Sequence, residues 1–208
     1  DLAWAAGDAQ AKGFLIGATS GRTTLNGEGL QHQDGHSHIL SSTIPNCKTY
    51  DPAYGYELAV IIEHGLKEMY KDKKNYFYYL TVTNERYVQP PKPKGMDVDS
   101  NIIKGMHRIS KTKKPQIRLL GSGAILNESI KAAEMLSGFE IESEVWSVSS
   151  FNMLRKDGME VENENIKNAS NKAKESFVAK SFSEHDIPTV ASTDYMRAYS
   201  EQIRPYID

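Results

Sequence analysis

Cysteine is almost absent from this 208-residue sequence, in which Cys47 is the single example. One thiol cannot form an internal disulfide. This excludes the class of small disulfide-bonded secreted domains and favours a reducing, cytoplasmic compartment. The thiol lies in a run typical of a strand, so we expect it to be buried and inert rather than a nucleophile. No apolar run approaches the roughly 20 residues needed to cross a bilayer, so no membrane role is expected.

Net charge is also small, because 25 lysines and arginines nearly balance 27 aspartates and glutamates. A formal net charge of -2 creates no strong global field toward nucleic acid or membrane surfaces. Short basic runs at residues 71–74 and 111–114 are typical of the solvated ends of helices or loops. We therefore expect no nucleic-acid partner. The chain begins without methionine, inside an apparent helical pattern, which indicates a piece of a longer protein.

Helix and strand patterns alternate in the first half of the chain. Residues 75–83 are almost continuously aromatic or β-branched, which is typical of a strand buried on both faces in a parallel sheet. Asp51 and Pro52 favour a helix start, with the Asp51 side chain as its cap. Apolar residues at three- and four-residue spacing then continue that helix to about residue 70. The remaining predictions for this half are a helix at residues 1–12 and strand pieces at 43–44 and 47–50.

A proline-rich stretch divides the chain. Residues 89–95 contain three prolines and no apolar periodicity, which predicts an extended linker. We therefore place a first domain at residues 1–88, the linker at 89–100 and a second domain at 101–208. In the second half, strands are predicted at residues 102–109, 116–120, 144–149 and 187–192, helices at 124–136, from 151 and at 193–207, and an exposed helix or loop at 160–174. This alternation predicts an α/β fold with mostly parallel sheets.

The turn Gly121-Ser-Gly123 lies between a predicted strand and a predicted helix, where dinucleotide-binding proteins carry a glycine-rich fingerprint. The third glycine of that fingerprint is missing, because Leu126 occupies its position. A tight turn from strand to helix is the better interpretation.

The most distinctive segment is residues 21–39, which hold three of the six histidines within seven positions. Four glycines in the same segment allow sharp bends and close approach of the backbone to other groups. Histidine changes its charge near working pH, so it suits proton transfer or metal ligation. Titratable groups on such a loop indicate a functional site.

Three hypotheses fit this loop. His32, His36 and His38 could bind zinc or iron together with Glu28 or Asp34, although their spacing matches no known metal signature. Alternatively, some of the histidines are structural and bond to backbone groups. In the third hypothesis, Glu28 and His32 belong to an active site in which the imidazole passes a proton and the carboxylate sets its tautomer.

Several longer motifs carry a specific resemblance. They are Trp4-Ala-Ala-Gly-Asp, Gly21-Arg-Thr-Thr-Leu-Asn-Gly-Glu-Gly-Leu-Gln-His, Ile44-Pro-Asn-Cys, Tyr50-Asp-Pro-Ala-Tyr, Leu119-Leu-Gly-Ser-Gly and Val190-Ala-Ser-Thr-Asp-Tyr-Met. Together they resemble the homodimeric bacterial pyruvate dehydrogenases, the decarboxylating first components of the pyruvate dehydrogenase complex. The resemblance covers nearly the whole chain.

The resemblance implies an enzyme of the transketolase-like superfamily that uses thiamine diphosphate and magnesium. It implies that pyruvate, or a related 2-oxo acid, is decarboxylated and that lipoyl groups of dihydrolipoamide acetyltransferase are reductively acetylated. The expected fold is the last part of a pyrimidine-binding domain followed by a truncated transketolase-type C-terminal domain. A homodimer is expected as well.

The resemblance also implies roles for two residues of the segment 21–39. His32 is expected to hydrogen-bond the substrate-derived part of the thiamine adduct and to assist proton transfer as the acetyl group moves to the dithiolane. Glu28 is expected to orient His32. Gln33 stands where the family pattern has glutamate, and residues 160–185 match the pattern poorly.

Other parts of the expected cofactor site are missing from the sequence. There is no Gly-Asp-Gly motif followed by asparagine for magnesium and diphosphate. The glutamate that activates the cofactor is expected upstream of Asp1. We therefore assign no metal ligand or cofactor-binding residue within this chain and expect the segment alone to be inactive. A non-catalytic dimerisation or scaffolding role is the main alternative, and a histidine-rich metallohydrolase is the third.

Overall fold

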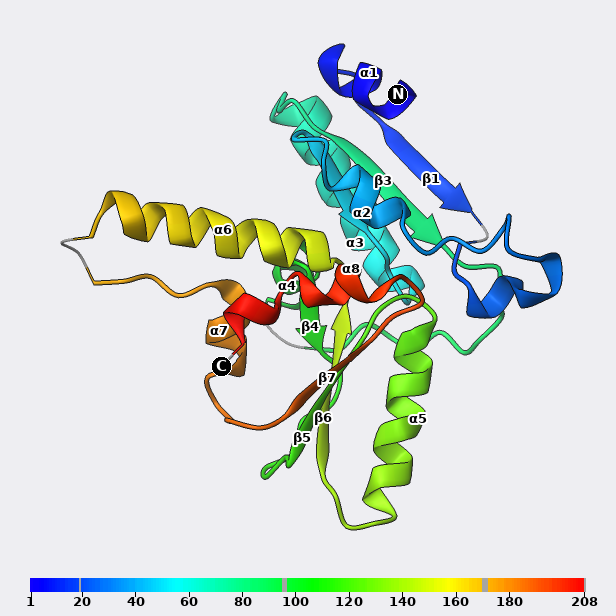
Figure 1. Cartoon of the computed structure of the whole chain (residues 1–208), viewed down its shortest axis with the longest axis vertical. Coiled ribbons are helices and arrows are strands. Elements are labelled where there is room, and N and C mark those ends of the chain that lie inside the picture. Colours follow the sequence, from blue (N-terminus) through cyan, green and yellow to red (C-terminus); the bar gives the residue numbers. More distant parts are fainter. Residues whose placement is uncertain (19, 95–96, 170–171, 208) are drawn as a thin grey trace.

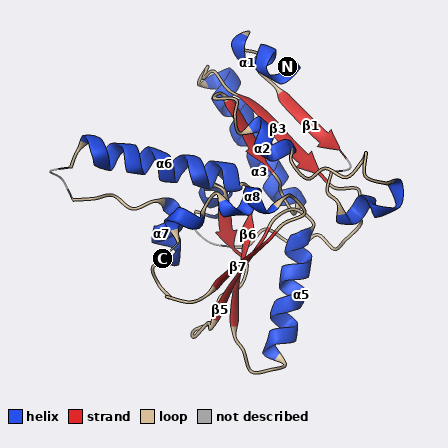
Figure 2. Cartoon of the chain, viewed as in Figure 1, coloured by secondary structure: helices blue, strands red, loops and turns tan. Residues whose placement is uncertain are grey.

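The computed structural model describes residues 1–18, 20–94, 97–169 and 172–207, without the side chains of Asn26 and Glu28. Two sheets with helices packed on them form this structure (Figures 1 and 2). The first half comprises α1 (Leu2–Asp8), β1 (Phe14–Ala18), the 3₁₀ helix η1 (Thr23–Glu28), α2 (Ser37–Ser41), β2 (Cys47–Tyr50), α3 (Gly55–Leu66), the π-helical turn η2 (Lys67–Lys71) and β3 (Phe77–Val82).

The second half has the same alternation of strands and helices. It comprises α4 (Val98–Lys104), β4 (Met106–Arg108), β5 (Ile117–Gly121), α5 (Ile125–Ser137), β6 (Ser143–Val148), α6 (Phe151–Lys167), α7 (Phe177–Phe182), β7 (Thr189–Ser192), α8 (Arg197–Glu201) and the 3₁₀ helix η3 (Arg204–Tyr206). Among the described residues, no helix is both long enough and apolar enough to span a membrane.

Both sheets are mostly parallel, as the sequence predicts. The first has the order β1-β3-β2 and is entirely parallel, with Leu80 of β3 opposite Ile16 on one side and Tyr50 on the other. The second has the order β4-β6-β5-β7, in which only β4 is antiparallel. The central position of β3 explains its continuous aromatic and β-branched sequence, because a strand paired on both sides under helices needs apolar residues on both faces.

The helix predicted after Asp51 is present, but its cap is different. Glu57 accepts hydrogen bonds from the backbone N–H groups of Ala53 and Tyr54, at 2.6 and 3.1 Å, and so caps α3 from within its first turn. The Asp51 side chain is buried and turns instead toward Thr81 of β3. The predicted capping role of Asp51 is therefore wrong.

Several other predicted boundaries are wrong. Residues 102–109 form the end of α4 and the short strand β4 rather than one strand, and α4 begins inside the predicted linker. Gly105, with a φ of 119°, ends α4 between them. The predicted strand piece at 43–44 is a turn, and the helix predicted at 193–207 is reduced to α8 and η3. The elements β1, α2 and α7 are additional to the prediction, and α6 continues to Lys167.

The two halves share a buried core. Ile102 of α4 belongs to the apolar cluster of Tyr50, Ile61, Tyr78 and Leu80 from the first half. Buried hydrogen bonds also cross between the halves: Ser147 Oγ donates to Glu57 Oε1 at 2.5 Å, and Ser150 Oγ donates to the carbonyl of Thr49 at 2.6 Å. The division into a domain at residues 1–88, a linker at 89–100 and a domain at 101–208 stays a prediction.

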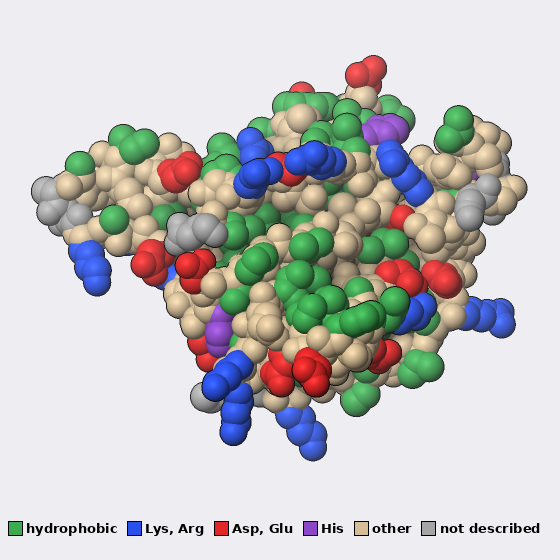
Figure 3. Space-filling view, turned by 60° about the horizontal axis from the view of Figure 1, so that its bottom comes forward, with side chains coloured by type: hydrophobic (Ala, Val, Ile, Leu, Met, Phe, Trp, Pro, Cys, Tyr) green, Lys and Arg blue, Asp and Glu red, His purple; other side chains and the backbone are tan. Residues whose placement is uncertain are grey.

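The surface agrees with the nearly balanced charge of the sequence. On the face shown in Figure 3, basic and acidic side chains are interspersed with apolar ones, without a large area of a single sign.

Candidate active site

The carboxyl ends of strands from both sheets meet in one region. The arrowheads of β3 and β6 point toward this central region in Figure 1. The backbone N–H of Asp51, after β2, donates to the carbonyl of Ser149, after β6, at 2.7 Å. The N–H of Gly123, after β5, donates to the carbonyl of Asp51 at 3.2 Å. Ligands of open α/β sheets bind outside the carboxyl ends of the strands, so this is the expected location for a site.

The histidine loop, defined here as residues 20–36, leaves the carboxyl end of β1 at this region and returns into α2. In Figure 1 it is the blue segment that projects beyond the end of β1. His32 is exposed near its tip, and its backbone N–H closes a turn onto the carbonyl of Gly29 at 3.2 Å. Leu30 beside it is 86% exposed. His32 is thus an exposed residue of the loop that follows β1.

The three histidines lie in different environments. His32 and His36 are exposed, whereas His38 is completely buried in α2. Among the described residues, no three His, Cys, Asp or Glu side chains come together as a metal site would require. The structure therefore does not support the hypothesis of a histidine metal centre. Glu28 ends η1, but its side chain lies outside the described part, so its pairing with His32 stays a prediction.

His38 has a structural role. Its Nε2 lies 2.9 Å from Thr81 Oγ1, and its ring packs against Tyr79, Tyr195 and Tyr199 at centroid distances of 5.3, 4.8 and 5.0 Å. Burial lowers the pKa of His38 to about 3, so the imidazole is neutral. Thr81 Oγ1 thus links the His38 ring to the buried Asp51, whose Oδ1 lies 2.7 Å away. His38 is therefore structural, but its ring bonds a side-chain hydroxyl and not the backbone group that the second hypothesis proposed.

Asp51 is a carboxyl group buried at the junction of the sheets, where sequence reasoning expected only a helix cap. Its Oδ1 accepts the hydroxyl of Thr81 at 2.7 Å. Burial raises the pKa of Asp51 to about 7. Hydrogen bonds from Thr81 and Ser122 act in the opposite direction, because they favour the ionised form, but burial outweighs them. A carboxylate directly after a buried strand is the one sequence signal that could have indicated this position.

The turn after β5 is shaped around that carboxyl group. Gly123 has a φ of 51°, and a Cβ there would lie 2.6 Å from Asp51 Oδ2. The glycine is required by this close approach of the backbone to Asp51. The predicted tight strand-to-helix turn at Gly121-Ser-Gly123 is therefore confirmed.

Asp34 organises the other end of the histidine loop. Its Oδ1 accepts from the backbone N–H groups of His36 and Ser37, at 3.1 and 3.0 Å, so it satisfies free amides at the start of α2. Partial burial acts to raise the pKa of Asp34, but the hydrogen bonds from Ser37 and His36 outweigh it and lower the pKa. Asp34 is thus an ionised residue that caps the start of α2.

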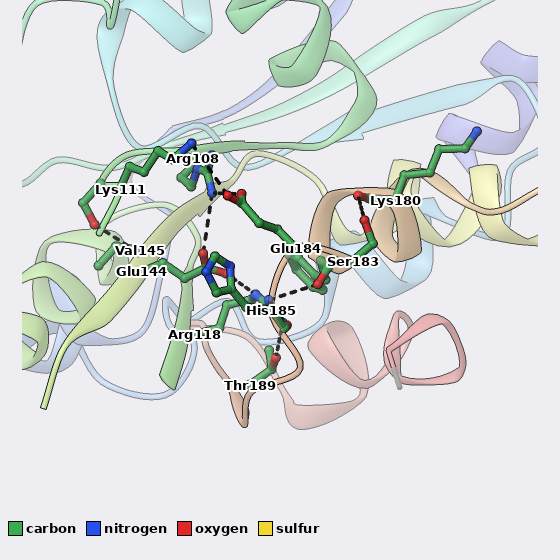
Figure 4. Close-up of polar contacts among 12 residues, drawn as sticks. Arg108, Lys111, Arg118, Glu144, Val145, Lys180, Ser183, Glu184, His185 and Thr189 are labelled. Atoms are coloured by element: carbon green, nitrogen blue, oxygen red, sulfur yellow. Dashed lines mark hydrogen bonds and ion pairs between the residues drawn. The ribbon is translucent and has the colours of Figure 1, made fainter. Parts of the chain in front are cut away.

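A cluster of charged residues lies at the opposite ends of the strands and is structural (Figure 4). The buried Arg118 pairs through Nε with Glu144, donates to Thr189 Oγ1 at 3.1 Å and to the carbonyl of His185 at 2.9 Å, and stacks on Phe182. Each guanidinium nitrogen already has a partner within the protein. This arrangement is typical of a buried ion pair that holds strands and loops together.

Cys47 is unlike an activated thiol. It is partly buried in β2, and burial raises its pKa to about 12. A nucleophilic cysteine needs a lowered pKa, so the structure agrees with the expected inert thiol.

Comparison with known proteins shows to which family the chain belongs. The family model described as pyruvate dehydrogenase E1 component middle domain matches residues 1–90, and that described as transketolase-like TK C-terminal domain matches residues 105–207. The chain is 56% identical over 211 residues to the pyruvate dehydrogenase E1 component of Pseudomonas aeruginosa and 50% identical to that of Escherichia coli K12. The chain belongs to the pyruvate dehydrogenase E1 family. Both alignments cover 100% of the chain but only 24% and 23% of the relatives, so it spans about a quarter of their length.

Solved structures support the expected transketolase-like fold. The transketolase of Campylobacter jejuni aligns with 99% of the chain and 27% of its own length, with a TM-score of 0.69 and 16% identity. The transketolase of Leishmania mexicana aligns with 99% of the chain and 26% of its own length, with a TM-score of 0.67 and 14% identity. At such low identity this likeness concerns the fold alone.

Proposed function

We propose that the chain is part of a thiamine-diphosphate-dependent pyruvate dehydrogenase that decarboxylates pyruvate and reductively acetylates the lipoyl domain of dihydrolipoamide acetyltransferase. The observation that carries this proposal is the 56% identity to a pyruvate dehydrogenase E1 component over the whole chain. The exposure of His32 beside the carboxyl ends of the strands supports it further.

The described residues do not by themselves fit thiamine diphosphate and magnesium. They contain no cluster of acidic or histidine side chains for the metal, and the buried Asp51 already has Thr81 as its partner. The sequence also lacks the Gly-Asp-Gly and asparagine motif. We therefore place the diphosphate and magnesium sites in other parts of the enzyme, and the contribution of this chain is its histidine loop.

His32 has the properties needed for a proton donor in acetyl transfer. When one sulfur of the lipoyl dithiolane takes the acetyl group, the other sulfur leaves as a thiolate and gains a proton. An exposed imidazole can supply that proton and can hydrogen-bond the oxygen of the acyl group. Glu28 would then orient the ring, as the family pattern implies. The capped, glycine-rich loop supports this role, because functional groups on loops need a rigid scaffold behind them.

The proposal extends to partners and location. Pyruvate is the proposed substrate, and a homodimer in the cytoplasm is the proposed form of the enzyme. Apolar side chains exposed on neighbouring parts of the first half support packing against a second subunit or another part of the enzyme: Trp4, Leu15, Ile16 and Leu40 are 45%, 46%, 57% and 62% exposed.

The test is steady-state kinetics of the full-length enzyme carrying His32→Ala. We expect acetylation of the lipoyl domain to fall by about 10²-fold or more, the usual contribution of a positioned proton donor. Pyruvate decarboxylation measured with an artificial electron acceptor should change much less. The matched control is His36→Ala, an exposed histidine of the same loop. Normal acetylation by His32→Ala would refute the proposed role.

A further inference from the structure

A carboxylate from the second half of the chain holds the start of the histidine loop. Asp194 follows β7, and its Oδ2 accepts from the backbone N–H groups of Arg22 and Thr23, at 3.1 and 3.2 Å. Its Oδ1 also accepts the hydroxyl of Thr23. The partners are more than 170 positions apart in the sequence. The N-cap residue Arg22 makes no capping bond with its own side chain, and Asp194 satisfies free amides at the start of η1 instead.

The backbone of the loop is shaped to admit this carboxylate. Gly21 has a φ of 98°, and a Cβ at that position would lie 2.6 Å from Asp194 Oδ2. Any other residue would both strain the backbone and displace the carboxylate. The contact therefore depends on two residues: Asp194 supplies the acceptor, and Gly21 leaves the space for it.

The end of the loop is tied to the same segment. The backbone N–H of Met196 donates to the carbonyl of Gly35 at 2.8 Å. The guanidinium of Arg22 packs over Gly35, where a Cβ would lie 2.0 Å from its Nη2. Both ends of the histidine loop are thus joined to each other and to residues 194–196, which leaves the tip with His32 between two fixed points.

We infer that Asp194 is a positioning residue for His32. The inference rests on the proposed function of His32 and deepens it. Asp194 acts through the start of the loop: it fixes the first turn of η1, and η1 leads into the turn that carries His32. We call the bonds of Asp194 to Arg22 and Thr23 the clamp. A misplacement of a reacting group by about 1 Å can cost about 10²-fold in rate, so loss of the clamp should reduce acetyl transfer without removing any reacting group.

The experiment compares Asp194→Ala and Asp194→Asn in the full-length enzyme with Glu201→Ala as control. Glu201 is an acidic residue of α8 whose carboxylate pairs with Arg197 and Arg204 of the same C-terminal segment. We expect Asp194→Ala to lower kcat for acetylation of the lipoyl domain about tenfold or more, with KM for the domain little changed. Asp194→Asn keeps an oxygen that can accept from the same amides, so it should recover part of that loss. Glu201→Ala should behave like the wild type.

A second readout tests the clamp without reference to activity. Amide hydrogen exchange at Arg22 and Thr23 should be faster in Asp194→Ala than in the wild type, because both N–H groups lose their acceptor. Thr23→Val, which removes only the hydroxyl contact, provides a milder variant if Asp194→Ala fails to fold. It should give a smaller change in the same direction in both readouts.

The outcomes separate the two proposals. Faster exchange together with lower kcat in Asp194→Ala, and partial recovery in Asp194→Asn, supports the inference. Unchanged exchange, or unchanged kcat while His32→Ala is impaired, overturns the positioning role and leaves the proposed function standing. Normal acetylation by His32→Ala overturns the proposed function. The positioning role is then overturned as well, whatever amide exchange at Arg22 and Thr23 shows about the clamp itself.

Discussion

Replacing Asp51 with asparagine tests the buried junction between the two sheets. Burial raises the pKa of Asp51 from 3.8 to about 7, so the folded protein binds this proton more tightly than the unfolded chain does. At 1.36 kcal/mol per pKa unit, that rise corresponds to about 4 kcal/mol. Asparagine keeps an oxygen that can accept from Thr81 but carries no charge that burial would penalise.

The sign of the pH dependence follows from the raised pKa. A group with a raised folded pKa contributes stability that is fully present below its unfolded pKa, here 3.8. That contribution is lost as pH rises through the folded pKa of about 7. The wild type should therefore lose stability relative to Asp51→Asn between about pH 4 and pH 8.

The assay is thermal unfolding of the full-length enzyme, followed by circular dichroism at several pH values in this interval. We expect the melting temperature of Asp51→Asn to rise relative to that of the wild type as pH increases. Asp99→Asn, which removes an exposed carboxylate paired with Lys92, is the control and should show no such trend. A difference between Asp51→Asn and wild type that is independent of pH, or that changes in the opposite direction, would refute the reasoning.

Three further predictions concern single contacts. Gly123→Ala should destabilise the enzyme by about 1–3 kcal/mol, seen as a lower melting temperature, because its φ of 51° and the nearby Asp51 carboxyl exclude a side chain. Arg118→Met should cost about 3–5 kcal/mol, because the buried Glu144 loses its nearest cation and keeps only Arg108 at 3.6 Å, and the additional change Glu144→Gln should recover part of that loss in the same unfolding assay. Cys47 should resist alkylation of the native enzyme at about pH 8, because its pKa is raised to about 12, and rapid labelling found by mass spectrometry would contradict this.

The elements that the sequence predicted well are those whose local pattern and tertiary role agree. The predicted strand at 75–83 is β3, because its apolar residues are needed on both faces of a central strand. The predicted helix after Pro52 is α3, whose Ile61 is fully buried in the core. In both cases the hydrophobic pattern reports burial directly.

The errors arise where local preference and packing disagree. Ile102 and Ile103 favour a strand by composition, but Ile102 packs into the core of the first half from the helix α4. β1 is only five residues long and half exposed, so it gives a weak strand pattern. α2 is equally short, and the sequence signal for its start was Asp34, whose carboxylate accepts from the backbone N–H groups of His36 and Ser37.

The sequence indicated the histidine loop but not the distant residues that hold it in place. The three histidines among glycines at residues 21–39 identify this region, and the resemblance singles out His32 within it. Local spacing could not show that His38 is buried among three tyrosines while His32 is exposed. Nor could it join Asp194 to Arg22, because a contact between distant segments leaves no local periodicity.

The central claim is that His32 belongs to the machinery of acetyl transfer, and a single-turnover reaction tests it most directly. Full-length enzyme loaded with pyruvate is mixed with an isolated lipoyl domain, and acetylated domain is measured by mass spectrometry over time. The account predicts a rate about 10²-fold lower in His32→Ala than in wild type or His36→Ala. Equal rates in all three enzymes would contradict it.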